Sequence, residues 1–335
     1  MNEHIHFFQD DGHPMRPWPP LAEKSRVLKL RHGGTLFYYD SGAISAGDGQ
    51  PRTLCGKPSV VLVHGLGDEA DSWRRLFGPL SAAGFRVIAP DLPGFGRSAV
   101  RGRISIGRHA AAVLELMEAS GAADRDNPAV LAGSSMGALA AEAAAFRRPD
   151  WVRALILMDG CLPLSGGVNK NLVLMGLPFI GKKWYRSFRQ NHERARRSLF
   201  PYYHDFEALP EEDRQFLRER VIARVESPDQ ERAYFASLRS LNLTGLFRKA
   251  RFARGLTRTP AKILLLWGAE DQVLPPEAGT AIRSLRPDAA HVEISGAGHL
   301  PHQEKPGETA AAILNFLQQL PQAGPPDLQR PGEPL

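Results

Sequence analysis

The sequence predicts an α/β fold: a mostly parallel, doubly wound sheet with an all-helical insertion between two of its strands. Short, continuous apolar runs recur along the chain and alternate with helical patterns, which is typical of a parallel sheet buried on both faces. Between residues 161 and 255 this alternation stops, and only helical patterns are found. An apolar run after Pro260 restarts the sheet.

In chain order, residues 1–26 are rich in Pro and His and predict an irregular N-terminal arm. Two strand-like runs follow, and six continuous apolar runs come after them. The expected strands are 27–30, 35–39, 60–63, 86–89, 129–132, 154–158, 263–267 and 291–294. The expected helices between them are 73–83, 107–120, 138–146 and 277–285.

The insertion carries helical patterns at 182–199, 211–225 and 230–247. We therefore expect a core formed by residues 27–160 and 256–320, with a helical cap over 161–255. Residues 321–335 contain five prolines and are expected to be a disordered tail.

Charge and cysteine content narrow the class of protein. Two cysteines imply neither a disulfide framework nor a cysteine-based metal site, and the N-terminus does not resemble a signal peptide. No apolar run reaches the roughly 18 residues of a membrane span, so we expect a cytoplasmic protein. The net charge of +6 is concentrated in 161–255, where 18 Lys and Arg face 10 Asp and Glu. A solvated arginine-rich surface explains this, and no nucleic-acid-binding motif accompanies the charge. The sequence predicts no oligomeric state.

The stretch from Gly133 to Gly137 has the form Gly-x-Ser-x-Gly, between an apolar run and an alanine-rich helix. A nucleophile elbow requires this context, because it holds a serine on a sharp, strained turn with its hydroxyl exposed above the sheet. Ser135 is thus the candidate nucleophile. The motif alone is weak, because this pattern also arises by chance.

A serine hydroxyl needs a base and a group that orients that base. Asp271 and His299 each follow a predicted strand, and the order Ser, Asp, His is the one expected for such a sheet. Asp159 and Glu270 are alternative acids. His302 could compete with His299, but we expect it to be solvated.

Acyl transfer also needs two backbone N–H groups that hold the oxyanion. The strand at 60–63 runs into His64-Gly65-Leu66-Gly67. The donors are expected to be the N–H groups of Leu66 and Met136, and His64 is expected to have a structural role.

These motifs resemble those of the α/β-hydrolase superfamily, in its serine-nucleophile, esterase- or lipase-like branch with a helical cap. The resemblance covers nearly all of 27–320 outside the cap and also rests on Asp91-Leu92-Pro93-Gly94-Phe95-Gly96-Arg97-Ser98. It implies a serine hydrolase that needs no metal or organic cofactor. Relatives with an Asp nucleophile, the haloalkane dehalogenases and epoxide hydrolases, are disfavoured by Ser135. Hydrolases of aromatic ring-cleavage products usually have a Gly-Pro-Gly-like loop and a Gly pair after the nucleophile's Met. Gly67-Asp68-Glu69 and Gly137-Ala138 weaken that interpretation here.

The cap is expected to line the substrate pocket. The pocket candidates are Trp73, Leu172, Met175, Phe179 and Trp184. The cap residues among them could instead be ordinary helix packing, or could join Lys182 and Lys183 in a weak interfacial contact with anionic lipid.

The expected function is hydrolysis of a carboxylic ester of a small or medium apolar substrate through an acyl-enzyme. C–C bond hydrolysis, amide or lactone hydrolysis and cofactor-free haloperoxidation use the same triad and stay open. Outside enzymes, the alternative is a hydrolase-like receptor for a small ligand.

Overall fold

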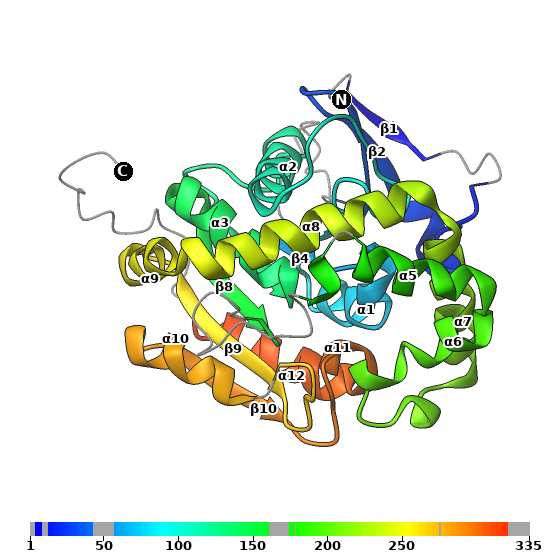
Figure 1. The fold of residues 1–335 in the computed structure, drawn as a ribbon. Helices are drawn as coiled ribbons and strands as arrows, with labels where there is room; N and C mark the ends of the chain where they lie inside the picture. The colour runs from blue at the N-terminus through cyan, green and yellow to red at the C-terminus, as the bar shows by residue number, and fades with distance from the viewer. Residues whose placement is uncertain are drawn as a thin grey trace.

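The computed structural model describes residues 4–8, 13–42, 57–160, 174–177, 179–274 and 276–320. Its centre is one ten-stranded sheet in the order β1-β2-β3-β5-β4-β7-β8-β9-β10, with β6 paired to β3 (Figure 1). The strands from β5 to β10 in this order run parallel, whereas β1, β2 and β3 pair in antiparallel fashion. The strands are β1 Ile5–Phe7, β2 Ser25–Lys29, β3 Gly34–Asp40, β4 Val60–Val63, β5 Val87–Pro90, β6 Ala99–Val100, β7 Ala129–Ser134, β8 Val152–Met158, β9 Lys262–Gly268 and β10 Ala290–Ile294. The predicted mostly parallel sheet is confirmed.

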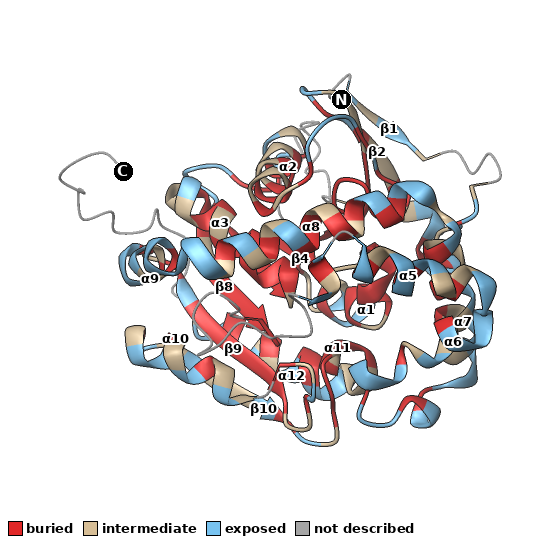
Figure 2. Ribbon diagram, viewed as in Figure 1, coloured by how far each residue is buried: buried red, intermediate tan, exposed pale blue. Residues whose placement is uncertain are grey.

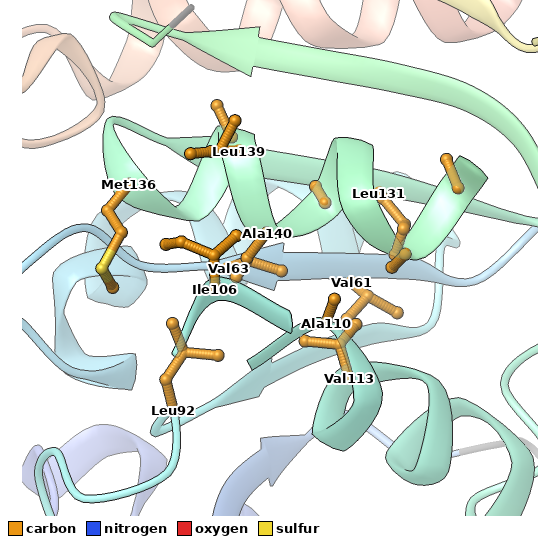
Figure 3. Packing of buried hydrophobic residues seen from close by; sticks show 14 of the residues in the cluster. Val61, Val63, Leu92, Ile106, Ala110, Val113, Leu131, Met136, Leu139 and Ala140 are labelled. Atoms are coloured by element: carbon orange, nitrogen blue, oxygen red, sulfur yellow. The ribbon is translucent and has the colours of Figure 1, made fainter. Parts of the chain in front are cut away.

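The sheet is covered on both faces, and the two-residue period of a strand sorts its side chains between them. Val61, Val63 and Leu131 face α2 (Ile106–Ala119) and α3 (Met136–Arg147), and this packing is drawn in Figure 3. Their strand neighbours Val60, Leu62 and Val130 belong instead to a second cluster with α1 (Arg74–Ala82) and α12 (Pro306–Gln318). Strands β4, β5 and β7 are buried throughout their length and β8 at all but one residue, and Figure 2 shows this for β4 and β8. The edge strand β10 is mostly exposed or half-buried.

The insertion between β8 and β9 is helical where the structure describes it. It contains α5 Ile180–Gln190, α6 His192–Arg197, α7 Glu211–Glu226, α8 Pro228–Phe247 and α9 Lys249–Arg258. The short helices α10 (Thr280–Leu285) and α11 (Pro301–Glu304) follow in the core. Within the described ranges, no helix is long and apolar enough to cross a membrane.

Three boundaries differ from the predictions. The helix expected at 182–199 is broken at Asn191, whose backbone is extended. The side-chain oxygen of Asn191 caps α6 by accepting the N–H of Arg194 at 2.9 Å. The expected cap boundary at residue 255 falls inside α9. The arm expected to be irregular over 1–26 contains β1 and a 3₁₀ helix at Pro19–Lys24. Residues 321–335 and Leu172 lie outside the described part of the chain.

Two side chains of the N-terminal segment are buried between core and cap. The side chains of Met15 and Trp18 are buried. The N–H of Trp18 donates to the hydroxyl of Tyr39 at 2.8 Å and to Oδ1 of Asp71 at 3.1 Å. From the cap, Arg220 donates to the carbonyl oxygen of Arg16 at 2.6 Å. The segment therefore joins the first strands to α7.

The loop after β5 is held by a buried ion-pair network. Arg97 donates through Nε to Oδ2 of Asp91 at 2.7 Å and through Nη2 to Oδ1 at 2.8 Å. Its Nη1 reaches Oδ2 of Asp71 at 2.8 Å, and Oδ1 of Asp91 also accepts the N–H of Ala70. Such a two-pronged pair fixes geometry. The motif from Asp91 to Ser98 therefore orders the backbone next to the site.

Candidate active site

Ser135 lies between the end of β7 and the first residue of α3. Its φ of 54° and ψ of −118° place it in the left-handed region that disfavours side chains, and the only other such non-glycine residue among those described is Asp159. A Cβ on Gly133 would lie 2.4 Å from the backbone of Gly137, and a Cβ on Gly137 would lie 2.1 Å from the carbonyl oxygen of Val63. Both glycines are thus required by close backbone approach, and the serine is presented on a strained strand-to-helix turn.

His299 and Asp271 meet at the same edge of the sheet. Nδ1 of His299 lies 2.7 Å from Oδ2 of Asp271, and both side chains are buried. The other oxygen of Asp271 accepts the N–H groups of Val273 at 2.8 Å and Leu274 at 2.9 Å. These backbone donors fix the carboxylate, which in turn orients the imidazole. Ser135 and His299 line one cavity of about 350 Å³ between core and cap.

Asp159 is adjacent to this pair. One carboxylate oxygen of Asp159, one of Asp271 and one ring nitrogen of His299 all lie within 4.8 Å of one another. Oδ1 of Asp159 accepts the N–H of Gly268 at 2.9 Å, whereas Oδ2 has no hydrogen-bond partner among the described residues. Burial, reinforced by the negative charge of Asp271, raises the pKa of Asp159 well above its usual range. Burial thus favours the neutral form of Asp159, and the hydrogen bond to the imidazole belongs to Asp271.

These three residues are the one group with metal-ligand spacing that the described ranges contain. Nδ1 of His299 is already engaged by Asp271, and a protonated Asp159 is a poor ligand, because metals require the deprotonated form. The chemistry of this set fits proton transfer better than metal binding.

The loop after β4 lies against the serine. A Cβ on Gly65 would approach Cβ of Ser135 to 3.4 Å, and Leu66 lines the cavity together with Met136. None of the hydrogen bonds found among the described residues uses the N–H of Leu66 or of Met136. Two backbone donors are thus available close to the Ser135 hydroxyl.

His64 holds this loop in place. It is fully buried; Nδ1 donates to the carbonyl oxygen of Gly65 at 2.8 Å, and Nε2 accepts the N–H of Leu92 at 2.8 Å, which assigns the tautomer. Burial lowers the pKa of His64, so the ring stays neutral. Its contacts are structural, as the sequence suggested.

The cavity wall is mostly apolar and aromatic, and the cap supplies much of it. Two of the predicted pocket residues, Met175 and Trp184, line it. Phe179 does not, because its side chain points to solvent and is 88% exposed. The prediction for Trp73 is also wrong: it is fully buried and stacks on His302 with ring centroids 4.3 Å apart.

That contact also corrects the expectation for His302. Its ring is fully buried rather than solvated, and Nε2 lies 2.9 Å from the hydroxyl of Ser72. Burial lowers its pKa to about 3. His302 is absent from the cavity lining and packs the core beneath it.

Sequence reasoning missed several lining residues. Tyr202, Tyr203 and Tyr234 come from the cap, and the carbonyl oxygen of Tyr202 accepts the N–H of His299 at 2.9 Å. Arg224 on α7 also lines the cavity and donates to Oδ1 of Asp68 at 2.6 Å and to both oxygens of Glu69 at 2.7 Å. No motif marked these residues, because their role depends on how the cap seats on the loop after β4.

Comparison with known proteins agrees with this geometry. The sequence profile of the alpha/beta hydrolase fold family matches residues 58–306. A 2-hydroxy-6-oxononadienedioate/2-hydroxy-6-oxononatrienedioate hydrolase of Pseudomonas putida is 28% identical, over 89% of this chain and 97% of its own. Lipase 1 of Psychrobacter immobilis is 25% identical, over 85% and 81%. The structure of a thermophilic esterase from Thermogutta terrifontis is 25% identical and superposes with a TM-score of 0.62, over 87% and 96%. The names of these relatives describe hydrolases of different substrates. The comparisons therefore do not decide which bond this chain hydrolyses.

Proposed function

The chain belongs to the α/β-hydrolase family, and we propose that it hydrolyses a carboxylic ester of a small or medium apolar substrate through an acyl-enzyme. One observation carries the proposal. The His299–Asp271 hydrogen bond of 2.7 Å lies in the cavity that also exposes Ser135 on its strained turn. A nucleophile, a base and an orienting acid are thereby collected at one apolar site.

In the proposed mechanism, the Ser135 hydroxyl oxygen attacks the ester carbonyl while Nε2 of His299 takes its proton. Asp271 accepts the Nδ1–H and stabilises the imidazolium. The N–H groups of Leu66 and Met136 hold the oxyanion. The imidazolium then protonates the leaving alcohol, and the C–O bond breaks to give the acyl-serine. His299 next deprotonates a water molecule, whose attack releases the acid and restores Ser135.

A second candidate is C–C bond hydrolysis, which the similarity to the Pseudomonas putida hydrolase favours. The name of that relative describes a dioate, so its substrate is an anion. In this cavity, Arg224 is the one Lys or Arg among the described lining residues, and Asp68 and Glu69 already neutralise it. The lining therefore favours an uncharged ester over a dicarboxylate.

The decisive experiment is hydrolysis of a p-nitrophenyl ester series by the wild type and by Ser135→Ala. We expect the variant to lose at least about 10⁴-fold in kcat while its circular dichroism spectrum is unchanged. A panel that adds an anilide, a lactone, hydrogen peroxide with a halide, and 2-hydroxy-6-oxo-6-phenylhexa-2,4-dienoate identifies the bond cleaved. Full activity of Ser135→Ala would refute the mechanism, and faster turnover of the dienoate would refute the ester.

Acyl preference is tested by Trp184→Ala, with Phe179→Ala as the matched control. Trp184 in α5 lines the cavity, whereas Phe179, the N-cap residue of the same helix, is solvent-exposed. Removing the indole should shift the preference toward longer or bulkier acyl groups, whereas the control should keep the wild-type profile. Labelling by a fluorophosphonate without turnover of any substrate would favour the receptor alternative.

A further inference from the structure

A second hollow, of about 570 Å³, lies apart from the catalytic cavity where α2, α3, α8 and α9 meet (Figure 1). Among the residues that the structure describes, six arginines line it and no Asp or Glu does. The core supplies two of them and the cap supplies four. They are Arg103, Arg147, Arg232, Arg239, Arg248 and Arg251.

The positive charge of this hollow is almost uncompensated. Among the described residues, only one of the six arginines forms an ion pair. This is Arg232, whose exposed pair with Asp229 has a distance of 3.1 Å. Arg147 donates to a backbone carbonyl, that of Gly107, at 2.8 Å. Burial and the neighbouring charges of Arg251 and Arg248 lower the pKa of Arg147. Residues 232–258 contain seven Lys and Arg and no Asp or Glu.

Helix dipoles explain only part of this cluster. Cations near a helix C-terminus are favourable, which accounts for Arg147 in the last turn of α3. Arg248 follows the end of α8 but is also the N-cap residue of α9, where the dipole disfavours a cation. Arg103 and Arg239 are not at such ends. Their convergence on one hollow brings like charges together, which costs free energy unless an anion is bound.

Exposed apolar side chains stand at the edge of the hollow. Leu243, Leu246 and Phe247 are 51%, 53% and 78% exposed, and Leu243 also lines the hollow. The period of a helix places Leu243 and Leu246 on the same face of α8 as Arg239. Figure 2 shows α9 and the adjoining end of α8 largely exposed. A soluble phosphate compound or the backbone of duplex DNA needs the cations alone. Cations with neighbouring apolar side chains are the pattern of a surface that enters a lipid headgroup layer.

We propose that the hollow between α2, α3, α8 and α9 binds the phosphate headgroup of an anionic phospholipid, while Leu243, Leu246 and Phe247 enter the interfacial layer. The arginines form charge-assisted hydrogen bonds with the phosphate oxygens. This docking surface is distinct from the interfacial contact considered for Lys182 and Lys183, and it does not depend on the reaction at Ser135.

The test is co-sedimentation of the full chain with phosphatidylcholine vesicles, with and without phosphatidic acid. Each arginine near an anionic surface raises the vesicle partition coefficient about fivefold. The triple variant Arg239→Gln, Arg248→Gln and Arg251→Gln should therefore lower this coefficient about a hundredfold. Replacing Leu243, Leu246 and Phe247 with Ser should also weaken it, by about tenfold or more. The control is Lys182→Gln with Lys183→Gln, which should bind within about twofold of the wild type. All variants should keep the wild-type melting temperature and turnover of a soluble ester.

Three results would overturn the proposal. They are no binding to anionic vesicles at low salt, equal binding to neutral and anionic vesicles, and an equal loss of binding in the Lys182→Gln, Lys183→Gln control. Arginine-dependent binding of glycerol phosphate without vesicle binding would identify a site for a soluble phosphate compound. Arginine-dependent binding of an oligonucleotide, unaffected by the Ser substitutions, would identify a nucleic-acid surface instead.

Discussion

Replacing Arg224 with Met should destabilise the contact between the cap and the loop that follows the candidate oxyanion loop. Glu69 is buried and the Arg224 side chain is 13% exposed, and their carboxylate and guanidinium groups are joined by two hydrogen bonds of 2.7 Å. A third, of 2.6 Å, goes to Asp68. The substitution keeps most of the side-chain volume and removes the charge. It leaves Glu69 facing only Arg220, at 3.4 Å.

The size of the effect follows from the proton that Glu69 must then take up. Burial already raises the pKa of Glu69 with Arg224 present, and the loss of this cation raises it further. Keeping Glu69 protonated at pH 7 against an ordinary value of 4.5 costs about 1.36 kcal/mol per unit, or about 3 kcal/mol. Loss of one partner of a buried ion pair typically costs a similar amount, about 3–5 kcal/mol.

The proton taken up by Glu69 also determines how the penalty of Arg224→Met depends on pH. A group whose folded pKa is raised favours folding below its unfolded pKa, and that contribution is lost as the pH rises through the folded pKa. The penalty of Arg224→Met should therefore shrink on acidification, to below about 1 kcal/mol near pH 5, because this pH is close to the ordinary Glu pKa of 4.5 and protonation then costs little.

Urea denaturation at pH 7 and pH 5 measures both quantities. Arg197→Met is the matched control, because Arg197 pairs with Glu193 one turn away in α6 and both side chains are mostly exposed. It should change the free energy of unfolding by less than about 0.5 kcal/mol. A loss below about 1 kcal/mol for Arg224→Met at pH 7, or a penalty that grows on acidification, would refute this reasoning.

Two further predictions concern buried carboxyl groups. Asp271→Asn should lower kcat by about 10³-fold to 10⁴-fold in a p-nitrophenyl ester assay, because the imidazole loses the acceptor for its Nδ1–H. Asp159→Asn should keep kcat within about tenfold of the wild type. The reverse ranking of the two variants would identify Asp159 as the orienting acid. Burial raises the pKa of Glu142 to about 8, so the wild type should lose stability relative to Glu142→Gln as the pH rises from about 5 to 8, and a pH-independent difference in urea titrations would contradict this.

The sequence allowed the sheet to be predicted because buried parallel strands are continuous apolar runs. Ser135, Asp271 and His299 could be placed for the same reason, since each follows a strand and the carboxyl ends of parallel strands share one edge. The break at Asn191 was missed although its signal, a residue type that favours N-caps, was present.

The pocket could not be predicted in the same way. Trp73 and His302 are far apart in sequence, and their stacking makes both of them core residues. Phe179 is apolar like Trp184, but only the packing of α5 decides which ring faces the cavity. The role of Arg224 depends on a contact with residues 155 and 156 positions away. Such pairings follow from tertiary structure and leave no local pattern.

The two buried side chains of the N-terminal segment have a consequence for the synthesis of the chain. Arg16 and Arg220, which bond in the folded protein, are 204 residues apart. At a translation rate of about 5–20 residues per second, Met15 and Trp18 leave the ribosome about 10–40 s before α7 exists. During that interval these side chains lack their partner on the cap. For most of its synthesis the nascent chain therefore lacks Phe216, which packs on Trp18, and Gln230, which contacts Met15.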